Sequence, residues 1–246
     1  RVTLDRAIRE IPQVFDLGVS ENSRGQSGGS GNIVYGNSIN LRGIGPNATL
    51  ILIDGHRVTN NSRSIDPSVL PTLGVERIEV VADGASAIYG SDAVAGVVNL
   101  IPRRSLDGVE AFVRAGISDD GHYHEYSGGV AVGKKWDRGQ VMIAYEHVEK
   151  SNLNGHQRAF FTSNQTPFGG TDYSVLRCAP GTIRSGANTW AIPSGGVTQA
   201  TVNRLVAGTS NRCNDLQGQD LIPRQAYDSA NGTFTFDVTD WLTVFA

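Results

Sequence analysis

Residues 39–58 read INLRGIGPNATLILIDGHRV, and residues 70–104 read LPTLGVERIEVVADGASAIYGSDAVAGVVNLIPRR. In the first stretch, Thr49–Ile53 is apolar on both parities, which predicts a central strand covered on both faces. Asp54-Gly55 then indicates a turn into a short returning strand. The second stretch predicts an alternating strand at Glu76–Val81 and an apolar strand at Val97–Ile101. A short half-buried strand is also expected at residues 39–42.

Short helices are predicted before and between these strands. Apolar residues recur at helical spacing from Leu4 to Ile11, with Thr3 as the N-cap and Pro12 as the stop. Asp66-Pro67 provides an N-cap and a first-turn proline for a second short helix, and residues 85–89 form a helical turn between two glycines. Short helices interspersed with strands predict a small α/β sheet domain.

The pattern changes after Arg104 to a period of two. Residues 109–117, 124–132, 141–146 and 234–238 show this period, with mostly apolar side chains on one parity and most of the polar ones on the other, and residues 242–245 begin a further strand. Such alternation over about 9–11 residues is typical of tilted membrane strands, which hydropathy windows do not detect. The turns at 119–121, 134–139 and 239–240 are short, whereas the polar stretch from Ser151 to about Asp228 is long.

Both cysteines, Cys178 and Cys213, lie in this long polar stretch, and their spacing fits no zinc pattern. We therefore expect a disulfide that staples the loop in an oxidising compartment. The stretch is long enough to carry a hairpin of its own, which the sequence does not locate.

The ordered set of Arg-Gly turn, TLILIDG strand, ERIEV strand and ASAIYGSDAVAGVVN segment resembles the plug domain of TonB-dependent outer-membrane receptors. The resemblance implies an α+β plug, a small mixed sheet with short helices, at residues 1–104. It implies that residues 105–246 are the N-terminal part of an incomplete transmembrane β-barrel of antiparallel strands, with an extracellular loop at about 151–228. Short turns on the periplasmic side and long loops outside agree with this orientation.

The resemblance also implies which residues act. Plug charges are expected to pair with the inner wall of the barrel, and the candidates are Arg42, Arg77, Glu79, Glu110 and Arg114. The alternative is ordinary solvated surface charge. The polar loops at residues 21–32 and 60–64 correspond to plug apices that touch ligand, or are merely flexible loops. The candidate ligand-binding residues are Arg24, Asn32, Tyr35, Asn60, Asn61 and Arg63.

The expected function is energised uptake of a scarce nutrient, such as an iron–siderophore complex, across the bacterial outer membrane. The expected partners are outer-membrane lipid, the bulky nutrient, and the inner-membrane TonB protein, which would act through a segment upstream of Arg1. A ligand-binding or signalling module without transport is the alternative. Both ends of the chain look cut, so a fragment of a longer receptor is expected.

Other functional classes find little support. The formal net charge of −3 argues against nucleic acid as a partner. Gly43–Ala48 matches the nucleotide-binding pattern G-x-G-x-x-A, but a strand rather than a helix follows it. His122 and His124 share a strand face without further metal ligands nearby in sequence. We therefore expect no metal, no cofactor and no enzymatic activity.

Overall fold

The computed structural model describes residues 4–15, 39–58, 66–216 and 218–246. The chain divides into two compact units, one formed by Arg1–Asn152 with Ile222–Ala246 and the other by Leu153–Leu221. In the described residues, no helix is long and apolar enough to cross a membrane.

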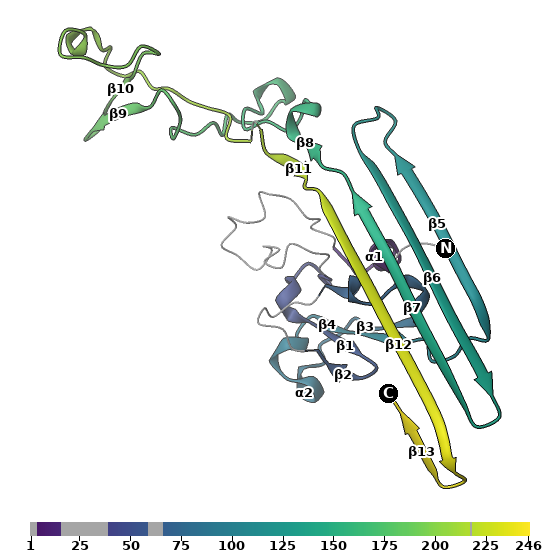
Figure 1. Cartoon of the computed structure of the whole chain (residues 1–246). Helices are drawn as coiled ribbons and strands as arrows, with labels where there is room; N and C mark the ends of the chain where they lie inside the picture. Colours follow the sequence, from purple (N-terminus) through teal and green to yellow (C-terminus); the bar gives the residue numbers. More distant parts are fainter. Residues whose placement is uncertain (1–3, 16–38, 59–65, 217) are drawn as a thin grey trace. The chain divides into compact units, whose positions relative to one another are not determined.

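The first unit begins with a small mixed sheet, which together with its helices we call the N-terminal domain (Figure 1). Its strand order is β2-β1-β4-β3, with β1 parallel to β4 and β3 antiparallel to β4. The strands are β1 (Thr49–Ile53), β2 (His56–Arg57), β3 (Val75–Val81) and β4 (Gly96–Pro102). The helices are α1 (Leu4–Arg9), η2 (Pro46–Ala48), η3 (Pro67–Val69), η4 (Thr72–Gly74), α2 (Ser86–Tyr89) and η5 (Ser91–Ala93).

The central strands are buried on both faces, as the apolar run Thr49–Ile53 predicts. Ile51 and Val98 face a core that includes α1, whereas Leu50 and Val97 pack in a second cluster on the opposite face. Asp66 caps η3 by accepting a hydrogen bond from the Ser68 backbone N–H at 2.8 Å.

Two local expectations differ from the structure. Residues 39–42 do not form a strand: Leu41 makes an isolated bridge to Val14, and a turn follows at Arg42 and Gly43. Arg42 and Gly43 have positive φ, which ends extended structure immediately after Leu41. The first helix also ends at Arg9 rather than at Ile11, because the chain turns before Pro12.

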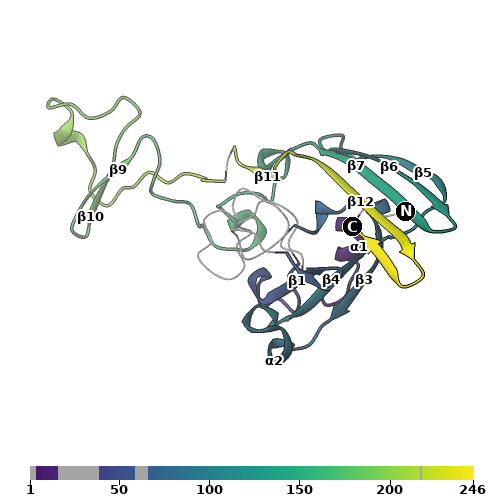
Figure 2. The same cartoon turned by 60° about the horizontal axis from the view of Figure 1, so that its bottom comes forward.

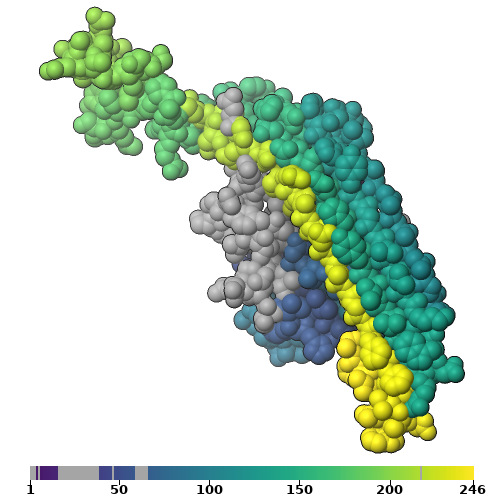
Figure 3. Space-filling view, viewed as in Figure 1, coloured from purple at the N-terminus to yellow at the C-terminus, as the bar shows by residue number. Residues whose placement is uncertain are grey.

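The same unit contains a five-stranded antiparallel sheet in the order β13-β12-β7-β6-β5. Its strands are β5 (Gly108–Ile117), β6 (His124–Trp136), β7 (Gly139–Lys150), β12 (Gln225–Thr239) and β13 (Leu242–Phe245). Figure 2 shows β5, β6, β7 and β12 as a curved layer beside the N-terminal domain, and Figure 3 shows β12 lying along β7. We call the side that packs on that domain the inner face.

The two faces of this sheet differ as the period of two predicts. Val113 on the outer face is 91% exposed, whereas Ala144 on the inner face is 1% exposed. The exposed outer residues are mostly apolar and include Val109, Ile117, Val132, Ile143 and Phe234. Strand β12 starts at Gln225, earlier than the alternation at Phe234 indicates, because its first half carries polar residues on both faces.

The second unit contains a short hairpin of β9 (Thr182–Ser185) and β10 (Asn188–Ala191). Three 3-10 turns also belong to it: η6 (Gly155–Gln157), η7 (Thr166–Phe168) and η8 (Val202–Arg204). Strand β8 (Leu153–Asn154) pairs with β11 (Asp220–Ile222) where the segment begins and ends. Cys178 and Cys213 form the expected disulfide, with 5.7 Å between their Cα atoms.

Gly96 provides a test of the packing in the N-terminal domain. A Cβ at this position would meet the Val81 carbonyl oxygen and would lie 2.7 Å from Leu41 Cδ1, and φ is +146°. We expect Gly96→Ala to lower the free energy of unfolding by about 3 kcal/mol, from strain and overpacking together. Pulse proteolysis in urea measures the change.

Gly55→Ala is the matched control, because Gly55 also has positive φ (+77°) but nothing lies within 4 Å of the added Cβ. It should lose only about 1 kcal/mol. Equal losses for the two variants would contradict the close approach at Gly96.

The disulfide is tested by mass spectrometry of the oxidised protein after thiol alkylation. We expect no alkylated cysteine before reduction and two after it. Two free thiols under oxidising conditions would refute the bridge.

Candidate functional site

The contact between the N-terminal domain and the inner face of the sheet is the best-developed candidate site. The turn η4 carries Leu73, which is 2% exposed and packs on Ala131, Met142 and Ala144. A Cβ at Gly74 would lie 3.5 Å from the Ala144 Cβ. Small side chains on the sheet therefore let this turn approach the strands closely.

Glu146 provides a polar link at the same contact. It lies on the inner face of β7 and is 3% exposed. The Thr72 backbone N–H donates a hydrogen bond of 2.5 Å to its carboxylate, and Thr72 Oγ1 accepts one of 3.2 Å from the Leu4 backbone N–H. A continuous chain of hydrogen bonds therefore runs from the start of α1 through η4 to the sheet.

A second link joins α1 to β6. The Arg6 guanidinium donates to the Glu125 carboxylate, and Arg114 Nε of β5 lies 3.6 Å from the same carboxylate. The Glu125 side chain is 14% exposed and that of Arg6 is 44% exposed. One carboxylate on the inner face thus faces two guanidinium groups, one from each side of the contact.

Two of the predicted charged residues of the N-terminal domain, Arg77 and Glu79, pair with each other. Arg77 binds its own neighbours, with Nε 2.9 Å from Glu79 and Nη1 3.1 Å from Glu76, and these hydrogen bonds, led by that to Glu79, raise the pKa of Arg77. The structure does not bring Arg77 or Glu79 to the sheet residues Glu110 and Arg114. Since residues 77 and 79 share a strand face, they satisfy each other locally.

Of two further predicted residues, one pairs inside the N-terminal domain and the other pairs at the junction between that domain and the sheet. Arg42 lies 3.8 Å from Asp83 in the N-terminal domain. Glu110 accepts two hydrogen bonds from Arg103, at 2.8 and 3.0 Å, where the chain enters the sheet. This hydrogen bonding raises the pKa of Arg103. The bidentate geometry fixes the connection between β4 and β5.

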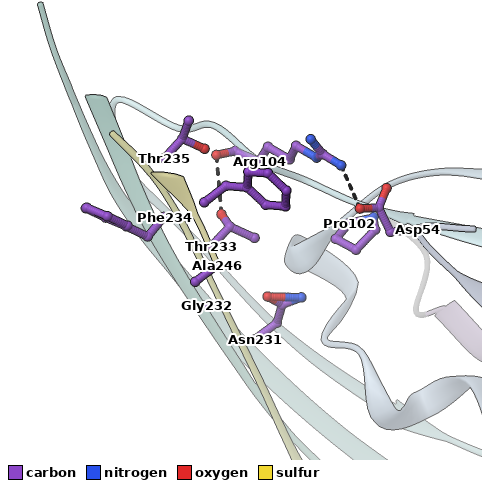
Figure 4. A pocket seen from close by; sticks show the side chains of 10 residues that line it. Asp54, Pro102, Arg104, Asn231, Gly232, Thr233, Phe234, Thr235 and Ala246 are labelled. Atoms are coloured by element: carbon purple, nitrogen blue, oxygen red, sulfur yellow. Dashed lines mark hydrogen bonds and ion pairs between the residues drawn. The ribbon is translucent and has the colours of Figure 1, made fainter. Parts of the chain in front are cut away.

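A small hollow of about 210 Å³ lies beside this connection. Figure 4 shows Arg104 directed at Asp54, with 2.6 Å between Nη2 and the carboxylate. The Thr233 hydroxyl of β12 donates to the Arg104 carbonyl oxygen at 3.3 Å. Ligand pockets usually measure about 300–1,000 Å³, so this hollow is too small for a bulky nutrient.

The six predicted apex residues, Arg24, Asn32, Tyr35, Asn60, Asn61 and Arg63, lie outside the described residues. His122 Nδ1 lies 3.3 Å from Asp120. Within the described ranges, no three His, Cys, Asp or Glu residues gather closely enough to hold a metal ion.

No sequence motif marks Arg6, Thr72, Glu125 or Glu146 as contact residues. Parity alone places Glu125 and Glu146 on the inner face, since each lies an even number of residues from an inner alanine, Ala131 or Ala144. A carboxylate whose parity places it on the inner face is therefore the sequence signal that identifies Glu125 and Glu146 as candidate contact residues.

Glu146→Ala tests the buried link. It leaves the Thr72 N–H without an acceptor, so we expect a loss of about 1–3 kcal/mol in the stability of the contact. Hydrogen exchange at the Thr72 amide should accelerate accordingly. Glu146→Gln keeps an acceptor and should have a smaller effect.

Glu149→Gln on the same strand is the matched control, because Glu149 pairs with Arg224 (2.6 Å) at an exposed position. It should leave exchange at Thr72 unchanged. Unchanged exchange in Glu146→Ala would contradict the link.

Comparison with known proteins is consistent with this arrangement. Residues 2–97 match the family model described as TonB-dependent Receptor Plug Domain. Over 95 residues the chain is 37% identical to the "Vitamin B12 transporter BtuB" of Vibrio vulnificus (strain CMCP6), covering 39% of this chain and 15% of that relative.

Solved structures align with nearly the whole length of the chain. A mutant of the ferric enterobactin receptor PfeA from Pseudomonas aeruginosa, in complex with enterobactin, aligns with a TM-score of 0.59 at 20% identity. The alignment covers 99% of this chain and 29% of that receptor. The siderophore receptor PirA from Acinetobacter baumannii aligns with a TM-score of 0.50 at 18% identity, covering 100% of this chain and 36% of that receptor. At these identities the likeness establishes the fold alone, and the chain spans about a third or less of these proteins.

Proposed function

We propose that this chain, which carries the plug domain of a TonB-dependent receptor followed by antiparallel strands of its barrel, is part of a transporter that takes up a scarce nutrient across the bacterial outer membrane. We assign residues 1–104 to the plug and residues 105–246 to the N-terminal part of the barrel. The polar stretch at about 151–228 is assigned to the external side, where its disulfide suits an oxidising environment.

The observation that carries the proposal is the difference between the two faces of the five-stranded sheet. The outer face exposes Val113, Ile117 and Ile143, each more than 60% accessible, while the inner face packs on the plug. Exposed apolar side chains in such a row are unfavourable in water and favourable in lipid. The sheet is therefore suited to separate lipid from an interior that the plug fills.

The plug contacts support a role in which the plug is held but not locked. A buried hydrogen bond to Glu146 and an ion pair to Glu125 join η4 and α1 to the sheet. Arg103 and Arg104, at the end of the plug, also bond to Glu110 and Thr233. Such links contribute a few kcal/mol in all. We propose that the inner-membrane TonB protein pulls on the chain N-terminal to α1 and breaks the links to Glu146 and Glu125, which both lead to α1.

The nutrient class is proposed from relatives. One compared solved structure is described as a ferric enterobactin receptor and the other as a siderophore receptor, whereas the curated relative is described as a vitamin B12 transporter. An iron–siderophore complex is the proposed substrate, with cobalamin as the competing one.

Uptake by cells that carry the full gene tests the proposal. We expect a labelled ferric siderophore to accumulate in cells with TonB and not in matched cells without it. Labelled cobalamin in the same two strains separates the two nutrients. Equal accumulation with and without TonB would contradict energised transport, and binding without accumulation would favour a binding or signalling module.

A further inference from the structure

The segment Leu153–Leu221 contains a hollow of about 610 Å³ within itself. This volume lies in the range of small-molecule sites, about 300–1,000 Å³. Its walls come from residues 191–211, so it does not depend on how this segment is placed against the rest of the chain.

The walls of the hollow are largely apolar. Ile192, Pro193, Leu205 and Val206 contribute side chains, and Thr198 and Thr201 add hydroxyl groups. Arg204 is the only charged residue among the lining residues. No hydrogen bond or ion pair engages its side chain within the described part of the chain.

Asn211 holds the hollow in shape. Its side-chain amide donates to the Ile192 carbonyl oxygen at 2.7 Å and to the Gly181 carbonyl oxygen at 3.0 Å. Its backbone N–H donates to Thr182 Oγ1 at 2.9 Å. These bonds fasten Asn211 to Thr182 at the start of β9 and to the residues that flank the β9–β10 hairpin, Gly181 and Ile192.

The disulfide closes the same substructure. Cys178 and Cys213 lie three residues before Gly181 and two residues after Asn211. The disulfide and the Asn211 hydrogen bonds hold the two ends of this substructure together. They restrict its backbone before binding, so a ligand loses less free energy in ordering it. The hollow is therefore formed before a ligand arrives.

We propose that this hollow is a binding site for a small anionic amphiphile, a carboxylate or similar acid on an aromatic or aliphatic body. The acid group would pair with Arg204, whose planar guanidinium suits a carboxylate, and the body would cover Leu205 and Ile192. No acidic side chain lines the hollow, so nothing there repels an anion. The inference holds whether or not the chain transports a nutrient.

The probe is 4′-fluorobiphenyl-4-carboxylate, followed by ¹⁹F NMR line broadening on the whole protein in detergent micelles, with empty micelles as background. We expect saturable binding that weakens at least tenfold for the neutral carboxamide analogue and for Arg204→Gln. A tenfold change corresponds to about 1.4 kcal/mol, the scale of one hydrogen bond to a charged group.

Arg177→Gln is the matched control, since Arg177 is exposed in the same segment but does not line the hollow. It should bind the probe as the unmodified protein does. Arg204 is itself exposed, so Arg204→Gln should keep the fold, and retention of the disulfide verifies this.

Reduction of the disulfide should also weaken binding, because it loosens the closed base. Equal binding by Arg204→Gln and the unmodified protein would overturn the proposal, as would equal losses in both arginine variants. A final arm uses vesicles containing phosphatidylglycerol. Arg204-dependent binding to these vesicles without saturable binding of the free acid would assign Arg204 to lipid and refute the site.

Discussion

The structure depends on a steric constraint, which is that the inner face of the sheet must be shallow enough for the plug. Ala131 and Ala144 leave room for Leu73 of η4. Gly133 leaves room for Leu106 in the connection that enters β5, since a Cβ at Gly133 would lie 2.7 Å from the Leu106 Cβ. Larger side chains here would force the plug away from the strands, because packed interiors tolerate little added volume. The apolar contact is therefore made by small residues on one side and by a tight turn on the other.

Within that contact, two carboxylates have different roles. Glu146 is buried and accepts a hydrogen bond from a backbone N–H that would otherwise be unsatisfied, so it contributes mainly by avoiding a desolvation penalty. Glu125 is partly accessible and faces Arg6 and Arg114, so its electrostatic contribution is screened. Both lead to α1, and a displacement of that helix therefore reaches the barrel strands through hydrogen-bonded and charged groups rather than through apolar contacts alone.

Periodicity predicted those strands in which each face has the same environment along the length of the strand. The apolar run Thr49–Ile53 became the doubly covered β1, and the alternation after Arg104 became β5 with Val113 outward. Periodicity failed where small and polar residues interrupt the apolar alternation, as in the first half of β12. The partners of single charges were the least predictable, because Arg77 is satisfied two residues away while Arg6 reaches 119 residues along the chain. The partner of a charged side chain depends on tertiary geometry, which no local sequence pattern encodes.

The central claim is that one sheet faces lipid on its outer side and the plug on its inner side. Spin labels introduced by Val113→Cys and Ile143→Cys on the outer face, and by Phe112→Cys and Asn231→Cys on the inner face, test it directly in the full receptor in bilayers. The measurement is the accessibility of each label to oxygen, which concentrates in lipid, against a water-soluble nickel complex. The account predicts high oxygen and low nickel accessibility at positions 113 and 143 and low oxygen accessibility at 112 and 231. Equal accessibility at adjacent positions 112 and 113, or the reverse pattern, would contradict it.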